Sequence, residues 1–509
     1  MVYAAENLFV RTGLTMLFIG IDLGTSAVKL LLADEKGTVI KTVSKTYEVF
    51  FPKNGWSEQN PADWYEQSKA GLVELLEGQD KSQVKGISFG GQMHGLVILD
   101  ENDEVIRPAL LWNDGRSAGE SDWLNTEIGM AKLTEETGNI SFAGFTASKI
   151  LWVRNNEPEN FAKIRKIMLP KDYLAYKITG VLSTDVSDAS GTLYFDVKNR
   201  TWSKYMLDVL GITEDMLPKI YESYEVTGKV LPSFASEIGI SEDVVVAAGA
   251  GDNAAAAIGM GIAGKAGRCN ISLGTSGTIF VSTDRFAECE GNALHSFAHA
   301  DGQWHLMGCM LSAASCNMWW MEDILKTSDY AGEQKDIADL GQNRIYFLPY
   351  LMGERSPIND SDARSAFVGM SMDTKREELT QAVFEGVAFA LKDSFEAVGK
   401  AGFTIESATV CGGGAKSPLW RKIIANVLGI VLERTENEEG PAYGGAILAM
   451  VAAGVYPDVK TACEALIKPT VCEVPQDALK ASYQARYAEY KKIYPALKSV
   501  FKDIASGRE

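Results

Sequence analysis

The sequence has few of the residues that build disulfide scaffolds or histidine-rich metal centres. It contains 7 cysteines and 4 histidines in 509 residues. The cysteines are scattered, odd in number and never spaced as C-x-x-C, which predicts reduced, mostly buried thiols in a cytoplasmic protein. His295, His299 and His305 are close in sequence, but a sheet and loop stretch is expected there rather than a zinc site.

Long apolar runs are also absent. The nearest candidate, residues 244–264, is interrupted by Asp252, so no membrane-spanning helix is predicted. The first residues carry Glu6 and Arg11 in the wrong order for a signal peptide. We therefore treat residues 1–15 as an N-terminal extension that precedes the first strand.

Positively charged residues are fewer than negatively charged ones. There are 49 Lys and Arg residues against 67 Asp and Glu, a net charge of −18. This balance argues against nucleic acid or an anionic membrane as a partner. An anionic substrate would have to be held by local amides, a few cations and a metal ion. The length predicts two large domains rather than one core.

A repeated tetrapeptide is the most informative feature that is present. Leu-Gly-Thr-Ser occurs at 23–26 and again at 273–276, each time between two apolar runs. Each copy predicts a strand–turn–strand hairpin whose amides and hydroxyls suit phosphate. The first copy follows Asp22, a candidate for a metal-linked phosphate, whereas the second follows Ser272 and adds no negative charge.

Strand and helix patterns alternate through both halves of the chain. They predict an α/β protein with two related domains, a mixed sheet in each and the ligand in a cleft between them. The domains expected are 16–262 and 263–509, the second ending in an aromatic-rich packing helix over 481–501. The main elements expected are hairpins over 17–34 and 96–112, a strand over 84–91, helices over 122–133, 148–158 and 169–180, and strand–turn–helix units over 244–261 and 409–429.

Asp252 lies in a glycine turn that also fits a dinucleotide fingerprint, Gly249-x-Gly251-x-x-Ala254. A dehydrogenase is disfavoured, because the Asp252 charge would face the pyrophosphate and no ribose-binding carboxylate follows about 20 residues later. As a helix N-cap, Asp252 would have a lowered pKa and stay ionised. An ionised carboxylate near a substrate hydroxyl is the general base that sugar phosphorylation needs.

Two further strand ends carry polar side chains that suit a polyol. Gln92, Met93 and His94 follow one glycine turn, and Trp112, Asn113, Asp114 and Arg116 follow a second strand. Tryptophan can cover the apolar face of a sugar, while the amide, carboxylate and guanidinium groups can bond its hydroxyls.

Two long motifs carry a family resemblance. They are Gly144-x-Thr146-x-x-Lys149-Ile150-x-Trp152-Val153-x-Asn155-Asn156 and Ser365-x-Phe367-x-Gly369-Met370, continuing to Glu385. With them, the chain resembles the FGGY carbohydrate kinases, which share the duplicated actin-like ATPase (ribonuclease H-like) fold, from about residue 16 to about residue 500. QMHG, LWNDGR, GWSEQNPADW and LPKDYL are similar to the members that act on xylulose.

The resemblance implies a role for each matching residue. Asp22 would lie near Mg²⁺ and the transferred phosphoryl group, and Asp252 would be the catalytic base, followed by Asn253 on the substrate side. Met93 and His94 would contact the sugar. The nucleotide would be held by the first phosphate loop (Gly24, Thr25, Ser26 and Lys29), the second (Gly274, Thr275 and Ser276) and an adenosine turn (Gly413, Gly414, Lys416 and Ser417), with Asn426 at the base.

The expected activity is therefore ATP- and Mg²⁺-dependent phosphorylation of D-xylulose to D-xylulose 5-phosphate, a step of xylose metabolism. Ribulose, gluconate or fuculose are alternative substrates, and a non-catalytic actin-like nucleotide switch is an alternative from another class. A homodimer is a family expectation. Ser356 and Ile358 depart from the family pattern in the loop 354–360, whose role stays open.

Overall fold

The structure is a computed structural model that describes residues 15–436 and 439–507. Within these ranges the chain forms two compact units. Unit 1 comprises the residues up to Gly264 together with Phe297–Gln303 and Glu439–Ile467, and unit 2 comprises the rest. Apart from Thr15, the expected N-terminal extension lies outside the described residues.

Unit 1 is built on a mixed sheet in the order β13-β14-β5-β1-β2-β3. β1 and β2 form the first predicted hairpin, β3 runs antiparallel to β2, and β5 and β14 are parallel to their neighbours. β15 continues along β5. The strands are β1 Leu17–Leu23, β2 Ala27–Asp34, β3 Val39–Thr46, β5 Val84–Gly91, β13 Val226–Lys229, β14 Val245–Ala247 and β15 Ala250–Gly251.

Unit 2 repeats this plan. Its sheet runs β18-β19-β17-β16-β22-β23-β24, with the antiparallel hairpin β16–β17 and the parallel strands β22 and β23 in the places of β1–β2, β5 and β14. The duplication predicted from the two Leu-Gly-Thr-Ser turns is confirmed. The strands are β16 Cys269–Leu273, β17 Gly277–Thr283, β18 His295–Ala298, β19 Trp304–Met310, β22 Ser407–Cys411, β23 Val431–Arg434 and β24 Thr470–Glu473.

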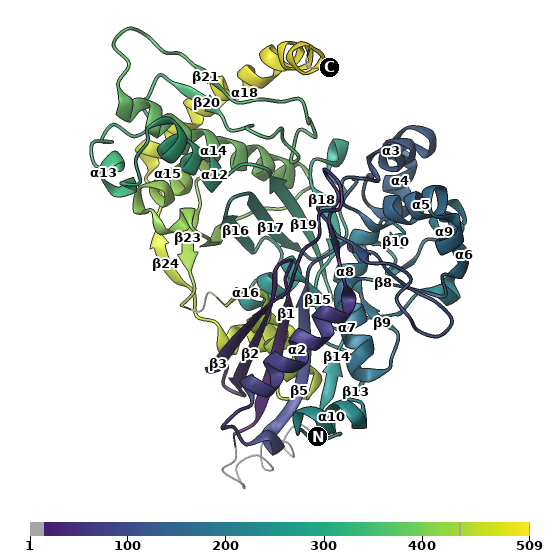
Figure 1. The fold of residues 1–509 in the computed structure, drawn as a ribbon. Coiled ribbons are helices and arrows are strands. Elements are labelled where there is room, and N and C mark those ends of the chain that lie inside the picture. The colour runs from purple at the N-terminus through teal and green to yellow at the C-terminus, as the bar shows by residue number, and fades with distance from the viewer. Residues whose placement is uncertain (1–14, 437–438, 508–509) are drawn as a thin grey trace. The chain divides into compact units, whose positions relative to one another are not determined.

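A helix from late in the chain completes unit 1. α16 (Gly440–Ala452), labelled near β1 in Figure 1, packs on β1, β5 and α11 (Asp252–Gly259). Glycines make this contact possible, since a Cβ on Gly444 would lie 1.8 Å from the carbonyl oxygen of Ala255. The compact units therefore differ from the contiguous halves expected from the sequence. The segment Glu439–Ile467 comes from the second half of the chain but belongs to unit 1, where its small-residue helix α16 is buried.

The helices predicted over 148–158 and 169–180 match α5 and α7, whereas the helix predicted over 122–133 is divided among α3, a π-helix and α4. α5 ends at Asn156 before Pro158, and α7 ends at Gly180 in a left-handed conformation. In unit 1 they are α2 Pro61–Leu75, α3 Ala118–Trp123, a π-helix Leu124–Gly129, α4 Met130–Thr137, α5 Thr146–Asn156, α6 Pro158–Lys163, α7 Pro170–Thr179, α8 Val186–Ala189, α9 Lys204–Leu210, α10 Pro232–Ile238 and α17 Val459–Leu466.

Unit 2 has a core in which the last helix is buried along one side. Tyr483, Tyr487 and Tyr490 of α18 pack around Phe389 of α14, so the predicted packing role of this tyrosine stripe is confirmed. The helices are α12 Ala314–Met318, a π-helix Trp319–Ile324, α13 Tyr330–Gln334, α14 Arg376–Lys400, α15 Pro418–Leu428 and α18 Asp477–Ser506.

The hairpin predicted over 96–112 forms only through isolated antiparallel bridges, Leu96 to Leu110 and Leu99 to Val105, and not as two continuously paired strands. β6 (Val97–Leu99) pairs with β8 (Lys166–Met168), and β7 (Ala109–Leu110) pairs with β4 (Glu58–Gln59). The two apolar strands satisfy their backbone groups with later and earlier segments of the chain, which a local pattern does not reveal.

Candidate active site

Two carboxylates lie at the same end of the unit 1 sheet. Asp22 is near the end of β1 and is paired in register with Gly90 of β5, while Gly251 is paired with Gly91 and is followed by Asp252. The glycines between them carry no side chain. The negative charge of Asp252 contributes to the raised pKa of Asp22, as expected for neighbouring carboxylates.

Burial changes the proton affinity of both groups. It raises the pKa of Asp22 to about 7, with the Asp252 charge adding to the rise and Lys29 opposing it. It raises the pKa of Asp252 to about 6, although Asp252 Oδ1 accepts hydrogen bonds from the backbone N–H and the side-chain Nδ2 of Asn253, at 2.7 and 2.9 Å. The lowered pKa expected for Asp252 is therefore wrong, because desolvation outweighs these bonds. At neutral pH the group is still mainly ionised.

The predicted N-cap role of Asp252 is also wrong. Gly251 is the N-cap of α11, and Asp252 is the first helical residue. Its carboxylate accepts from the next amide instead of closing the first turn. The side chain is thus held by Asn253 at the edge of the sheet, with Oδ2 not engaged in these bonds.

Replacing Asn253 by alanine should move the pH dependence of the reaction. The change removes one of the two bonds that favour ionised Asp252, so its pKa rises, and the acid limb of kcat/KM, expected near pH 6, shifts upward by about one pH unit. The measurement is the pH profile of phosphorylation. Asn199→Ala is the matched control, since exposed Asn199 bonds Asp196 in the same way, and an unshifted profile for both variants would contradict the assignment.

His94 is fixed by several contacts with neighbouring segments of unit 1. Its Nδ1 is 2.8 Å from the carbonyl oxygen of Gly191, which can only accept, so Nδ1 carries the proton and the neutral ring has its acceptor at Nε2. The ring stacks on Phe145, with centroids 4.6 Å apart. Its backbone is left-handed, with φ +67, and its carbonyl oxygen accepts from Lys149 Nζ at 2.8 Å.

Gln92 and Met93 lie beside His94 and are buried. Met93 packs against Gly251, where a Cβ would come within 2.9 Å of its side chain. Gln92 donates to Gln59 Oε1 at 3.1 Å, and its own Oε1 has no hydrogen-bond partner among the described residues. A buried acceptor of this kind suits a ligand hydroxyl.

The four predicted sugar contacts in LWNDGR divide into two kinds. Trp112 and Asn113 are exposed, and Trp112 Nε1 donates to Thr25 Oγ1 at 2.9 Å. Asp114 and Arg116 are buried in an ion pair with two hydrogen bonds of 2.7 and 2.8 Å, and Arg116 also pairs with Glu58. Direct sugar contact by Asp114 and Arg116 is therefore contradicted, because their polar groups are occupied by one another and by the loop.

The first Gly-Thr-Ser turn is held from outside by side chains and by its own backbone. Gly24 N–H donates to Ala27 O at 3.1 Å, and Gln59 Nε2 donates to Thr25 O at 2.6 Å. Ser26 is exposed. Lys29, expected to bind the nucleotide, forms an ion pair with Glu439, and its charge partly opposes the rise in the pKa of Asp22.

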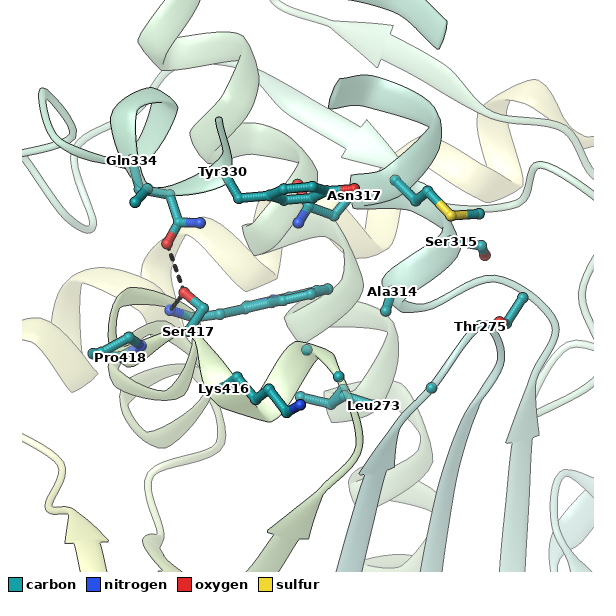
Figure 2. A pocket seen from close by; sticks show the side chains of 16 residues that line it. Leu273, Thr275, Ala314, Ser315, Asn317, Tyr330, Gln334, Lys416, Ser417 and Pro418 are labelled. Carbon is teal, nitrogen blue, oxygen red and sulfur yellow. Dashed lines mark hydrogen bonds between the residues drawn. The ribbon is translucent and has the colours of Figure 1, made fainter. Parts of the chain in front are cut away.

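Unit 2 contains a cavity of about 680 Å³ beside the second Gly-Thr-Ser turn. Its wall contains most of the nucleotide-binding residues predicted for this unit. Figure 2 shows Tyr330 and Asn317 on one side and Lys416 and Leu273 on the other. The predicted residues that line it are Gly274, Thr275, Gly413, Gly414, Lys416 and Ser417.

Further lining residues come from α12 and α13 and were not predicted. Gln334 Oε1 accepts from Ser417 Oγ at 2.6 Å, and Ser417 Oγ also accepts the N–H of Trp420 at the start of α15 (Figure 2). Asn317 is 8% exposed and its Oδ1 has no partner among the described residues. Aromatic faces of Tyr330 and Trp420 with these amides suit a purine base. No motif marks Tyr330 or Gln334 in the sequence.

Two residues expected at the nucleotide do not line this cavity. Asn426 is 1% exposed, donates to Lys422 O at 2.7 Å and accepts from Gln476 N at 2.7 Å, so its amide joins α15 to the start of α18. A role at the base edge is contradicted. Ser276 is exposed next to Thr275 and is not among the residues that line the cavity.

The loop 354–360, left open by the sequence, supports the second turn. Glu354 Oε1 accepts from Leu311 N and Arg355 N, both at 2.8 Å, and burial raises the pKa of Glu354 to about 7. The Leu311 segment continues to Ala313, whose N–H donates to Thr275 O at 3.0 Å. The loop therefore positions the backbone that holds the phosphate turn.

Two further structural findings concern the whole described chain. None of the helices in residues 15–436 and 439–507 is both long and apolar enough to cross a membrane. All seven cysteines lie in these ranges, and none forms a disulfide.

Comparisons with known proteins match the chain over nearly its full length. The FGGY family of carbohydrate kinases matches in both parts, its N-terminal domain over residues 17–259 and its C-terminal domain over residues 269–453. The chain is 40% identical to the xylulose kinase of Escherichia coli (strain K12) over 489 residues, 94% of this chain and 99% of that protein.

Solved structures are similar over the same length. A xyloylose kinase from Brucella ovis is 40% identical, with a TM-score of 0.90 over 95% of this chain and 100% of that chain. A gluconate kinase from Lactobacillus acidophilus is 26% identical, with a TM-score of 0.91 over 96% of this chain and 100% of that chain. The chain belongs to the FGGY family of carbohydrate kinases.

Proposed function

We propose that this kinase transfers the terminal phosphoryl group of ATP to D-xylulose and forms D-xylulose 5-phosphate. The observation that carries the proposal is the half-buried pair Asp22 and Asp252 at one end of the unit 1 sheet, since an ionised carboxylate at a polyol-binding site is what hydroxyl phosphorylation requires. The choice of xylulose rests on the similarity to xylulose kinases over nearly the full chain.

Asp252 acts as the general base. A sugar hydroxyl bonded to its carboxylate loses its proton to Asp252 as the new bond to phosphorus forms and the bond to ADP breaks. With a pKa of about 6, Asp252 is deprotonated at neutral pH yet basic enough to take the proton in the transition state. His94 Nε2 and Gln92 Oε1 accept hydrogen bonds from other sugar hydroxyls. These bonds determine which sugars the site selects.

The nucleotide is bound by unit 2. Its base occupies the cavity between Tyr330 and the Gly413–Gly414 turn, and its phosphates follow the amides of the second Gly-Thr-Ser turn. The acceptor hydroxyl is held on unit 1, where Trp112 Nε1 donates to Thr25 Oγ1 at 2.9 Å.

Magnesium fits the chemistry of Asp22. This carboxylate shares the negative potential of Asp252, and the nearby Lys29 is already paired with Glu439. No group of three or more metal-ligating side chains occurs within residues 15–436 and 439–507, which matches the way Mg²⁺ binds through one or two carboxylates and phosphate oxygens. Bound there, Mg²⁺ would neutralise charge on the transferred group, and Asp22 would hold it.

The substrate assignment is tested by ADP release with purified protein, Mg-ATP and a panel of sugars. D-Xylulose should give the highest kcat/KM, above ribulose, fuculose and gluconate. A higher value for one of these would replace xylulose as the substrate while keeping the kinase activity. Release of ADP that no sugar stimulates would instead favour a nucleotide switch.

Replacing His94 by alanine should weaken the selection among sugars more than the binding of ATP. Loss of the Nε2 acceptor removes one hydrogen bond to a sugar hydroxyl, and such bonds discriminate strongly between sugars. We expect the ratio of kcat/KM for xylulose over ribulose to fall about tenfold, with an unchanged KM for ATP. An unchanged ranking of sugars would make His94 a purely structural residue.

We propose that the enzyme works in the cytoplasm. Seven cysteines without a disulfide suit the reducing cytoplasm. A homodimer is expected from the family resemblance, and sedimentation of the purified protein measures it.

A further inference from the structure

A polar segment behind the site is buried from end to end. Every residue from Ser183 to Phe195 is buried, although most of the first ten are polar. Burying hydroxyls and carboxylates costs free energy unless they are bonded to something that uses them. The polar residues are Ser183, Thr184, Asp185, Ser187, Asp188, Ser190 and Thr192.

Asp185 is the centre of this segment. Its Oδ2 accepts from Ser187 N at 2.8 Å, Ser187 Oγ at 2.5 Å and Ser223 Oγ at 2.7 Å. Its Oδ1 lies 2.8 Å from Lys171 Nζ, which also pairs with Asp172 at 2.7 Å. The ammonium group thus anchors Asp185, and Asp185 fixes the direction of the Ser187 hydroxyl.

Ser187 connects Asp185 to the residue that precedes the catalytic base. The Ser187 hydroxyl donates a hydrogen bond to Asp185, so its oxygen can act as an acceptor. It accepts a hydrogen bond from the N–H of Gly251 at 3.1 Å. Gly251 is the N-cap of α11 and directly precedes Asp252. The orientation of the first helical turn, and with it the Asp252 carboxylate, follows from this bond.

Gly191 connects the same segment to His94, the proposed sugar-binding histidine. Its carbonyl oxygen accepts from His94 Nδ1 at 2.8 Å, which selects the ring tautomer. It also needs to be glycine, because a Cβ at this position would lie 2.4 Å from the His94 ring. One short segment therefore contacts the residue before the base and the histidine beside it.

We propose that Asp185, Ser187 and Gly191 of this buried segment, anchored by Lys171, form a positioning element that sets Asp252 and His94 relative to each other. This inference rests on the proposed function, since it assigns the segment to the transfer of phosphate to a sugar hydroxyl. Its residues touch neither sugar nor nucleotide and act through Gly251 and His94.

The Ser187→Ala variant removes the acceptor for Gly251. We expect kcat for xylulose to fall about tenfold, because a small displacement of the base is costly, while KM for ATP stays within twofold. Ser187→Cys keeps the volume with a weaker hydrogen-bonding group and should lose kcat in the same direction. Ser187→Thr keeps the hydroxyl and should recover most of the rate. Gly191→Ala should instead raise KM for xylulose about tenfold.

Ser190→Ala is the matched control. Ser190 is equally buried in the same segment, but its hydroxyl bonds Val186 O and Ala298 N rather than the site. It should leave kcat and both KM values near wild type. Equal losses in the Ser187 and Ser190 variants, or a full rate for Ser187→Ala, would overturn the inference. A wild-type enzyme inactive on xylulose would refute the proposed substrate instead.

Discussion

Replacing Asp252 by asparagine should lower kcat for sugar phosphorylation by about 10²–10⁴-fold. Asparagine keeps the shape of the side chain and can still accept from Asn253 through its carbonyl oxygen, but it cannot take the hydroxyl proton. Steady-state kinetics should show this loss in kcat, with KM for ATP nearly unchanged because the nucleotide cavity is formed by residues of unit 2.

Asp243→Asn is the control for this variant. Asp243 is an exposed carboxylate of the same unit, paired with Lys229 on the surface, and its replacement should leave kcat at the wild-type value. Turnover by Asp252→Asn close to that of Asp243→Asn would remove Asp252 from the mechanism. A loss of ATP binding in Asp252→Asn would point to a damaged fold rather than a missing base.

Replacing Gly444 by alanine should destabilise unit 1 strongly. The added Cβ would lie 1.8 Å from Ala255 O and 2.7 Å from Ala255 C, both backbone atoms, so α16 and α11 must separate. Overpacking against backbone costs about 3 kcal/mol of the free energy of unfolding. Because Asp252 begins α11, activity should fall along with stability, as urea denaturation followed by kinetic assay would show.

Gly399→Ala provides the comparison. Gly399 is also a helical glycine, in α14, but an added Cβ there meets nothing within 4 Å. Its replacement should keep or slightly raise stability through helix propensity. If Gly444→Ala unfolded at the same urea concentration as Gly399→Ala, the close packing of α16 on α11 would be disproved.

Local patterns were enough to predict the strands and turns that carry the chemistry. The Leu-Gly-Thr-Ser repeat predicted both hairpins, and the apolar run before Gly249 predicted a strand leading into α11. These features depend on neighbours in sequence. The placement of Asp22 and Asp252 was predictable in the same way, because both follow from strands that end at neighbouring positions of the sheet.

What could not be predicted depends on partners far along the chain. The spacing of Asn426 predicts a contact with the base, yet its side-chain amide accepts a hydrogen bond from Gln476 N. Arg116 likewise forms an ion pair with Glu58. The pKa of Asp252 was placed in the wrong direction because a helix terminus is visible in a sequence and the degree of burial is not. Tyr330 and Gln334 reach the cavity only through the path of α13.

The late position of α16 sets a limit on the order of events during synthesis. β1 and β5 leave the ribosome hundreds of residues before Gly440–Ala452, the helix that packs against them. The sheet face that this helix covers therefore stays exposed until the helix has been synthesised. A nascent chain stopped after the first sheet would carry that apolar surface uncovered. Chaperone binding should therefore persist through translation and end once the last stretch of the polypeptide has emerged.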